Sequence, residues 1–183
     1  MPYDLAEHRH RFAVWAAARA AQRGFTTVAN LRKALESVNI KGIIAAPENL
    51  QLDEEEFNAL HRRLCLEICA FLSSRHIKKT THGRAAKLVS VYLKATVLMG
   101  DACDSPLARN MHPPVDRILL QNLAASEKIK SEHKAAWRSI NWTQLNQNTY
   151  DLLIDQLRSL LPHGAAFWRI EEYWEPSDNE DTF

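Results

Sequence analysis

The chain has 183 residues, 46% hydrophobic and 25% charged, with a formal net charge of +1. This length and composition are typical of one globular domain that can bury a core. No apolar run approaches the roughly 20 residues needed to span a membrane, and the first 12 residues lack the apolar segment of a signal peptide. The odd number of cysteines indicates reduced thiols in a cytoplasmic protein.

The sequence predicts an all-α fold, because no segment shows the apolar–polar alternation with a period of two that marks a β-strand. Asp4 and Glu7 fit a capping box for a first helix, and Gly24 suits its C-terminal end. A second helix, capped by Thr26 or Thr27, is predicted to run to about Ser37. Residues 39–52 are predicted to be a loop that packs onto the core through isoleucines.

Asp53 is predicted to cap a third helix, since three glutamates follow it where the helix dipole favours acids. Apolar residues recur along this helix at spacings of three and four, which predicts a core-facing stripe. The stripe consists of Phe57, Leu60, Leu64, Ile68, Phe71 and Leu72. Cys65 and Cys69 share this helix but lack a second pair of ligands, so neither a metal site nor a cofactor is predicted.

The next helix organises the prediction, because residues 85–99 are apolar on almost every side. Such a helix is buried at the centre of the domain. Its basic residues Arg84, Lys87 and Lys94 lie on one stripe, which is predicted to face a solvent cleft or an acidic partner.

The second half of the chain is predicted to contain shorter helices. After an irregular link over 100–111, the helix predicted over 113–125 has two prolines and Asp116 in its first turn. Further helices are predicted over 127–140 and from Asn148 or Thr149 to Leu161, the latter with a leucine face that includes Leu152. An aromatic segment over 166–174, either a short helix or extended, completes a compact single-domain multi-helix bundle, residues 1–174. Residues 175–183 are expected to be a disordered acidic tail.

The small net charge conceals an asymmetry. Residues 171–183 carry six acids and no Lys or Arg, so residues 1–170 have 23 basic against 16 acidic residues. Within residues 57–94, eight basic residues face a single acid, Glu67. This block is either a solvated helix surface or a surface that faces phosphates. In the second case the acidic tail is expected to compete with an anionic partner.

Lys87 is the residue with the most distinct predicted chemistry. Burial and the positive end of the helix both disfavour its ammonium form, so its pKa should fall and leave a usable amine nucleophile. Alternatively, Lys87 extends to solvent. Asp116 is either an electrostatic stabiliser or only an acid at a helix start.

The run Gly83-Arg84-Ala85-Ala86-Lys87, followed by a long apolar helix and Pro114-Val115-Asp116, resembles the helix–hairpin–helix DNA glycosylases. The resemblance implies a hairpin that grips the DNA backbone, Lys87 as the nucleophile that attacks the sugar C1′, and Asp116 as the carboxylate that stabilises the developing positive charge. The residues predicted to contact nucleic acid are Lys78, Lys79, His82, Gly83, Arg84 and Lys94.

The sequence departs from the family in two respects. Ala85 occupies the place of a second hairpin glycine, and residues 100–111 lengthen the gap between Lys87 and Asp116. Four blocks, HRFAVWAAARAA, HGRAAKLVSVYLK, HPPVDRILL and WRIEEYW, are also similar to short uncharacterised bacterial proteins.

Two other functional interpretations remain open. One is an enzyme in which His76, His82 and His112 supply acid–base or metal chemistry. The other is a non-enzymatic α-helical module that binds nucleic acid or protein, with its basic block on phosphates and its aromatic C-terminus on a partner. DNA is the expected partner in the glycosylase interpretation, and no membrane contact is expected.

Overall fold

The structure, a computed structural model, describes residues 4–175. Within this range every regular element is helical and no strand occurs, so the prediction of an all-α domain is confirmed. The helices are α1 (Leu5–Gln22), α2 (Val28–Ser37), α3 (Ile40–Ile43), α4 (Glu54–Ser74), α5 (His82–Leu93), α6 (Pro106–Asn110), α7 (Arg117–Ala125), α8 (Lys134–Ser139) and α9 (Gln147–Arg158). Three segments are 3-10 helices: η1 (Pro47–Asn49), η3 (Trp142–Gln144) and η4 (Phe167–Tyr173). The segment η2 (Lys94–Leu98) is a π-helix.

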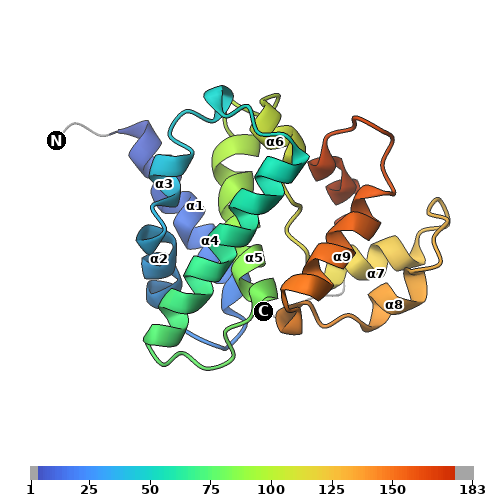
Figure 1. Cartoon of the computed structure of the whole chain (residues 1–183), viewed down its shortest axis with the longest axis horizontal. Coiled ribbons are helices and arrows are strands. Elements are labelled where there is room, and N and C mark those ends of the chain that lie inside the picture. The colour runs from blue at the N-terminus through green and yellow to red at the C-terminus, as the bar shows by residue number, and fades with distance from the viewer. Residues whose placement is uncertain (1–3, 176–183) are drawn as a thin grey trace.

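Helix α5 lies at the centre of the molecule (Figure 1). It packs against α1 and α4 on one side, and against η3 and α9 on the other. The first side is completed by α2 and the second by α7 and α8, which pack on each other. The helix that joins both sides therefore carries the side chains on which the functional argument depends.

The burial of α5 confirms the predicted central helix. Every residue of α5 except Val91 is buried. Its neighbour α1 presents a strip of alanines, including Ala13 and Ala17, which are fully buried. Small residues allow two helix backbones to approach closely, which explains why α1 covers α5 so completely.

The central helix does not continue to Met99 as a regular α-helix. It widens at η2 into a π-helical turn, where the N–H of Met99 donates to the carbonyl of Lys94 at 2.9 Å. A π turn inserts an extra residue and rotates the next part of the helix around the axis. The residues after Lys94 are consequently not in the register that a regular helical repeat predicts.

Two helix starts differ from the predictions. Asp4 caps α1 by accepting from the N–H of Ala6, but Glu7 binds Arg11 and Lys41, so the predicted capping box is absent. At Asp53, where only a cap is predicted, a complete capping box forms with Glu56.

The second half contains more irregular chain than predicted. Helix α7 begins at Arg117 rather than Pro113, because Asp116 has an extended backbone and caps the helix with its side chain. Of residues 127–140, only Lys134–Ser139 is helical. The link over 100–111 includes the short helix α6, and the loop over 39–52 includes α3.

Helix α9 begins at a capping box formed by Asn146 and Thr149. Its buried face consists of Tyr150, Leu153, Ile154 and Leu157. Leu152, predicted on that face, is 61% exposed because it lies on the opposite side of the helix from Leu157 and its neighbours.

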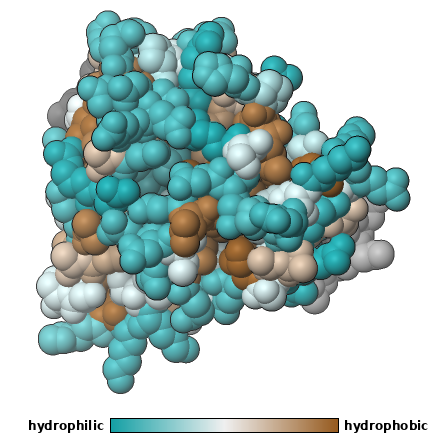
Figure 2. All heavy atoms as spheres, turned by 45° about the vertical axis from the view of Figure 1, so that its right-hand side comes forward, coloured by the Kyte–Doolittle hydropathy of each residue, from teal (hydrophilic) through white to brown (hydrophobic). Residues whose placement is uncertain are grey.

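The surface seen in Figure 2 is largely hydrophilic, with small separate apolar patches. No helix among residues 4–175 combines the length and apolarity needed to cross a bilayer. The predicted acidic tail falls on residues 176–183 apart from Glu175, and therefore lies outside the described range.

Candidate functional site

Lys87 and Asp116 form a buried ion pair. The Nζ atom of Lys87 lies 2.8 Å from Oδ2 of Asp116, and both side chains are less than 10% exposed. Lys87 Nζ also donates to the backbone carbonyl of Pro114 at 3.0 Å. The two residues singled out by the sequence are thus direct partners across 29 positions of chain.

Asp116 is oriented by three donors. As the N-cap of α7, its Oδ1 accepts from the N–H of Leu119 at 2.9 Å. Its Oδ2 accepts from Lys87 and from the indole N–H of Trp174, the latter at 2.9 Å. A carboxylate held by this many donors keeps one rotamer, so its charge points at a fixed place.

The pair has shifted ionisation. Burial lowers the pKa of the Lys87 amine, against the opposing influence of Asp116. Burial acts to raise the pKa of Asp116, but Lys87 and the N–H donors of Leu119 and Trp174 outweigh it, so this pKa is lowered. Asp116 remains a carboxylate, while Lys87 loses its proton more easily than an exposed lysine.

A second ion pair lies beside the first. Lys94, the first residue of η2 and about two turns beyond Lys87, binds Glu171 of η4, and its ammonium lies 5.8 Å from the centre of the Trp174 ring. An open pocket of about 430 Å³ borders this pair and is also lined by Trp168 and Arg169. Lys87 and Lys94, two of the three residues of the basic stripe, thus face acidic partners supplied by the second half of the same chain.

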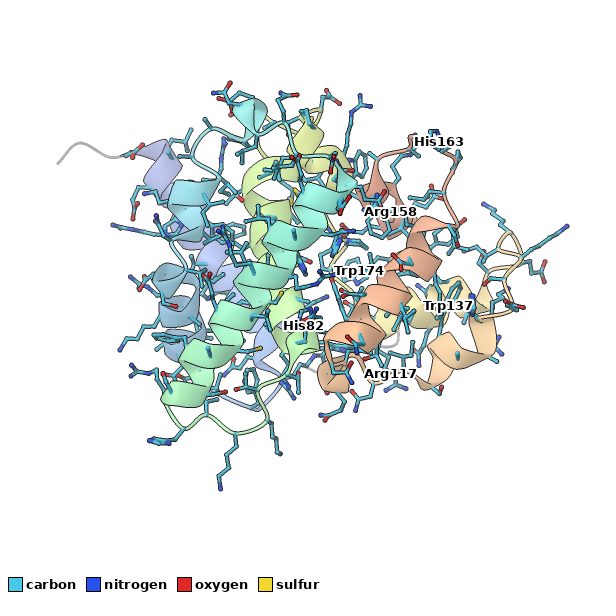
Figure 3. All side chains as sticks on the ribbon, viewed as in Figure 1. His82, Arg117, Trp137, Arg158, His163 and Trp174 are labelled. Atoms are coloured by element: carbon cyan, nitrogen blue, oxygen red, sulfur yellow. The ribbon has the colours of Figure 1, made fainter. Side chains whose placement is uncertain are left out.

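The C-terminal segment covers the Lys87–Asp116 pair. Trp174 is 39% exposed and places its indole N–H on Asp116, while Phe167 and Ile170 of η4 are fully buried. Figure 3 shows Trp174 between the helices of the two sides. The sequence predicts Trp168, Tyr173 and Trp174 as either core or lid residues or a surface that docks a partner, but no sequence signal connects Trp174 with Asp116.

The six residues predicted to contact nucleic acid are divided between surface and interior. Lys78 and Lys79 are exposed in the turn between α4 and α5. Lys94 is half-buried against Glu171. The remaining three, His82, Gly83 and Arg84, are buried in the first turn of α5.

Gly83 is enclosed by the chain itself. Its N–H donates to the carbonyl of Leu145 at 2.9 Å, and a Cβ at this position would lie 2.0 Å from the carbonyl oxygen of Trp142. Glycine is therefore required here for the approach of η3. The guanidinium of Arg84 lies over the ring of Phe25 at 4.3 Å, with Nε and Nη1 buried and unpaired.

A second cluster of titratable side chains fills the contact between α4, α5 and α9. His61, Cys65 and His82 place one potential ligand atom each within 4.8 Å of one another. His112 and Tyr150 complete the cluster, with their rings 5.8 Å apart. The sequence signal that could have found it is His61 and Cys65 at i and i+4 on one helix, whereas the prediction considered Cys65 only together with Cys69.

His76, predicted to act together with His82 and His112, is exposed with a left-handed backbone at φ 57°. His112 has both ring nitrogens engaged: Nε2 donates to the amide oxygen of Asn58 at 2.7 Å, and Nδ1 accepts from the Tyr150 hydroxyl at 3.2 Å. Of the three histidines, only His82 and His112 share a cluster.

Comparison with known proteins identifies no matching protein family, no similar curated protein and no similar solved structure, so the geometry of the chain carries the functional argument.

Proposed function

We propose that this chain binds DNA and acts as a base-excision glycosylase and lyase, with Lys87 as nucleophile and Asp116 as stabilising carboxylate. The observation that carries the proposal is the buried 2.8 Å contact between a lysine of lowered pKa and a carboxylate fixed at the start of α7. An amine nucleophile needs a desolvated lysine, and a developing sugar cation needs a fixed negative charge.

The roles follow from what each residue can do. Lys87, after losing its proton, attacks the sugar C1′ and the base departs. Asp116 keeps its charge through the reaction, because its pKa is lowered, and it offsets the positive charge that develops on the sugar. The C1′–O4′ bond of the sugar then opens as a proton passes from the Lys87 nitrogen to O4′, which leaves Lys87 joined to C1′ as a Schiff base that borohydride reduces to a stable link.

Access to Lys87 requires the C-terminal segment to move. The amine is buried, and the indole of Trp174 occupies the outer side of Asp116. The partly exposed Trp174 and the adjacent 430 Å³ pocket mark the side from which a sugar would approach. Exposed Lys78 and Lys79 supply positive charge for phosphate contacts.

Borohydride trapping tests the proposal. The protein is incubated with duplex DNA that contains an abasic site or one of a panel of damaged bases, then reduced. Wild type should form a covalent complex that Lys87→Met abolishes. Asp116→Asn should retain DNA binding but react at least about a hundredfold more slowly, which is typical for the loss of one stabilising charge.

Lys94→Met is the matched control, because Lys94 is on the same helix and also pairs with a carboxylate. Its substitution should reduce trapping far less than Lys87→Met does. If no substrate yields a trapped complex with a wild-type protein that is folded and binds DNA, the lysine-nucleophile mechanism is wrong.

A specific observation favours a second function, that of a non-enzymatic nucleic-acid-binding module. The Gly83 N–H is engaged by Leu145 within the chain, and the Lys87–Asp116 pair is covered by Trp174. In this case exposed Lys78 and Lys79 account for binding without chemistry. Gel-shift titrations at two salt concentrations test the binding that both cases require: Lys78→Ala with Lys79→Ala should weaken it and reduce its salt dependence, whereas Lys87→Met should leave both unchanged. Borohydride trapping then distinguishes the cases, because a non-enzymatic module binds DNA but yields no trapped complex.

A further inference from the structure

We infer that His61, Cys65 and His82 bind a single divalent ion of the zinc type between α4 and α5. Their potential ligand atoms, one imidazole nitrogen from each histidine and the cysteine sulfur, lie within 4.8 Å of one another, and all three residues are buried. The inference concerns a site separate from the Lys87–Asp116 pair and does not depend on any activity toward DNA.

The spacing of the three residues suits a shared ion. His61 and Cys65 are at i and i+4 of α4, so their side chains project from the same face one turn apart. The sulfur of Cys65 is 3.8 Å from Nδ1 and 3.9 Å from Nε2 of His61. A tetrahedral zinc ion with bonds of about 2.3 Å to sulfur and 2.0–2.1 Å to nitrogen separates those ligand atoms by about 3.6 Å.

His82 supplies the third ligand from a different helix. It is the first residue of α5, and its side chain turns into the cluster, where its ring centre lies 6.5 Å from that of His61 and 5.2 Å from that of Tyr150. Figure 3 shows His82 at the junction of the two sides of the molecule. Its Nε2 is buried and has no hydrogen-bond partner.

That unpaired nitrogen is the independent sign of a ligand. A buried polar atom without a partner is costly, so native proteins rarely leave one. His82 is only 6% exposed, which excludes ordinary solvation of the ring. An ion bound by Nε2 satisfies it, and the same ion gives the buried Cys65 thiol and His61 ring a common partner.

His112 and Tyr150 are better suited to supporting the site than to binding the ion. The nitrogens of His112 are already engaged by Asn58 and Tyr150, while its ring centre lies 4.4 Å from that of His61. The Tyr150 ring stacks on that of His61 with 9° between their planes. These contacts fix the His61 ring, and the fourth position of a tetrahedral ion is left to a non-protein ligand such as water.

The consequence for the fold is a link between α4 and the start of α5. His82 precedes Lys87 by five residues on the same helix, so an ion at His82 holds the helix that carries Lys87.

Borderline-soft Zn²⁺ matches one thiolate with two imidazoles, whereas Mg²⁺ and Ca²⁺ prefer oxygen ligands. Binding releases the Cys65 thiol proton, since the thiolate is the form that coordinates metal.

The test uses the full chain, unfolded with a chelator and refolded in the presence of Zn²⁺ or Co²⁺, because the site is buried. Wild type should retain one zinc ion per chain after dialysis, and the cobalt form should show thiolate-to-metal absorption. Cys65→Ser should lose that absorption, and His82→Asn should weaken zinc binding by more than about a hundredfold, the upper end for a supporting residue. Cys69→Ser, one turn further along α4, should behave as wild type.

Two results would overturn the inference. One is wild type that refolds with less than half an equivalent of zinc and no thiolate absorption with cobalt, a result that needs no variant. The other is cobalt absorption that survives in Cys65→Ser but disappears in Cys69→Ser. Should Cys65→Ser fail to fold, Cys65→Ala, which preserves a small buried side chain, takes its place.

Discussion

Asp116→Asn is the substitution that most directly tests how the buried pair is held. Asparagine keeps the shape of the side chain and can still accept the Leu119 N–H as an N-cap. It removes the charge opposite Lys87, whose Nζ then keeps one backbone acceptor, the carbonyl of Pro114 at 3.0 Å. A buried ammonium without a counter-charge is expected to lose its proton instead.

The cost of that proton loss sets the magnitude. In the unfolded chain Lys87 has an ordinary pKa of 10.5. Because this pKa lies 3.5 units above pH 7, removing the proton at pH 7 costs about 5 kcal/mol. If the intact pair itself contributes little net stability, this cost of about 5 kcal/mol is the largest destabilisation that Asp116→Asn can cause. Removing one partner of a buried ion pair typically costs about 3–5 kcal/mol, which agrees with that limit. We expect Asp116→Asn to lower the free energy of unfolding by about 3–5 kcal/mol at pH 7.

The pH dependence gives the assay a distinct signature. In the variant, Lys87 is neutral when folded and protonated when unfolded, so the unfolded state binds more protons and stability rises with pH. Urea unfolding followed by circular dichroism should show the deficit shrinking by about 1.4 kcal/mol per pH unit between pH 7 and pH 9. A deficit that is constant across this range would refute the reasoning, because it would mean that Lys87 stays charged.

Lys87→Met is the comparison for this experiment. Without Lys87, Asp116 still accepts from the N–H groups of Leu119 and Trp174, and methionine fills a similar volume. Lys87→Met should therefore destabilise the protein less than Asp116→Asn does. If Lys87→Met destabilised the protein more than Asp116→Asn, the remaining contacts would satisfy an isolated Lys87 better than an isolated Asp116.

Three further outcomes are expected. Gly83→Ala should destabilise the protein by about 1–3 kcal/mol in urea unfolding without DNA, because its Cβ meets a backbone carbonyl; Gly42→Ala, whose Cβ meets only the Asn39 side chain, should cost less, and equal costs would argue against the clash. Borohydride trapping should rise with pH with a midpoint below pH 10.5, and Asp116→Asn should move that midpoint to lower pH because the carboxylate raises the Lys87 pKa; an unmoved midpoint would contradict this. Trp174→Phe removes the partly exposed hydrogen bond from the indole N–H to the Asp116 carboxylate, so it should lower the free energy of unfolding by about 1 kcal/mol and speed trapping. Slower trapping would show that the indole assists the reaction.

The sequence was informative where a local pattern determines a local structure. Thr27 and Asp53 cap α2 and α4 as predicted, because a cap is decided by a side chain and the backbone within three residues. The burial of α5 was predictable from its apolar composition. That Lys87 would face Asp116 was implied only by the resemblance, since no rule of spacing brings residues 29 positions apart into contact.

The features that could not be predicted depend on contacts between distant segments. Gly83 was interpreted as a hairpin glycine, although its requirement comes from the carbonyl of Trp142, 59 positions later in the chain. The acidic partner of Lys94 proved to be Glu171, and nothing near Lys94 in the sequence identifies it. The π turn at η2 likewise has no local sequence pattern that predicts it, because it depends on how the central helix packs against the rest of the domain.

The indole of Trp174 has a consequence for the order in which the site assembles during translation. Trp174 follows Asp116 by 58 residues, and at about 5–20 residues per second it is synthesised roughly 3–12 seconds later. Helix formation takes about a microsecond, so α5 and the start of α7 have ample time to meet first. We therefore expect a stage of synthesis in which Lys87 and Asp116 are already paired but still uncovered.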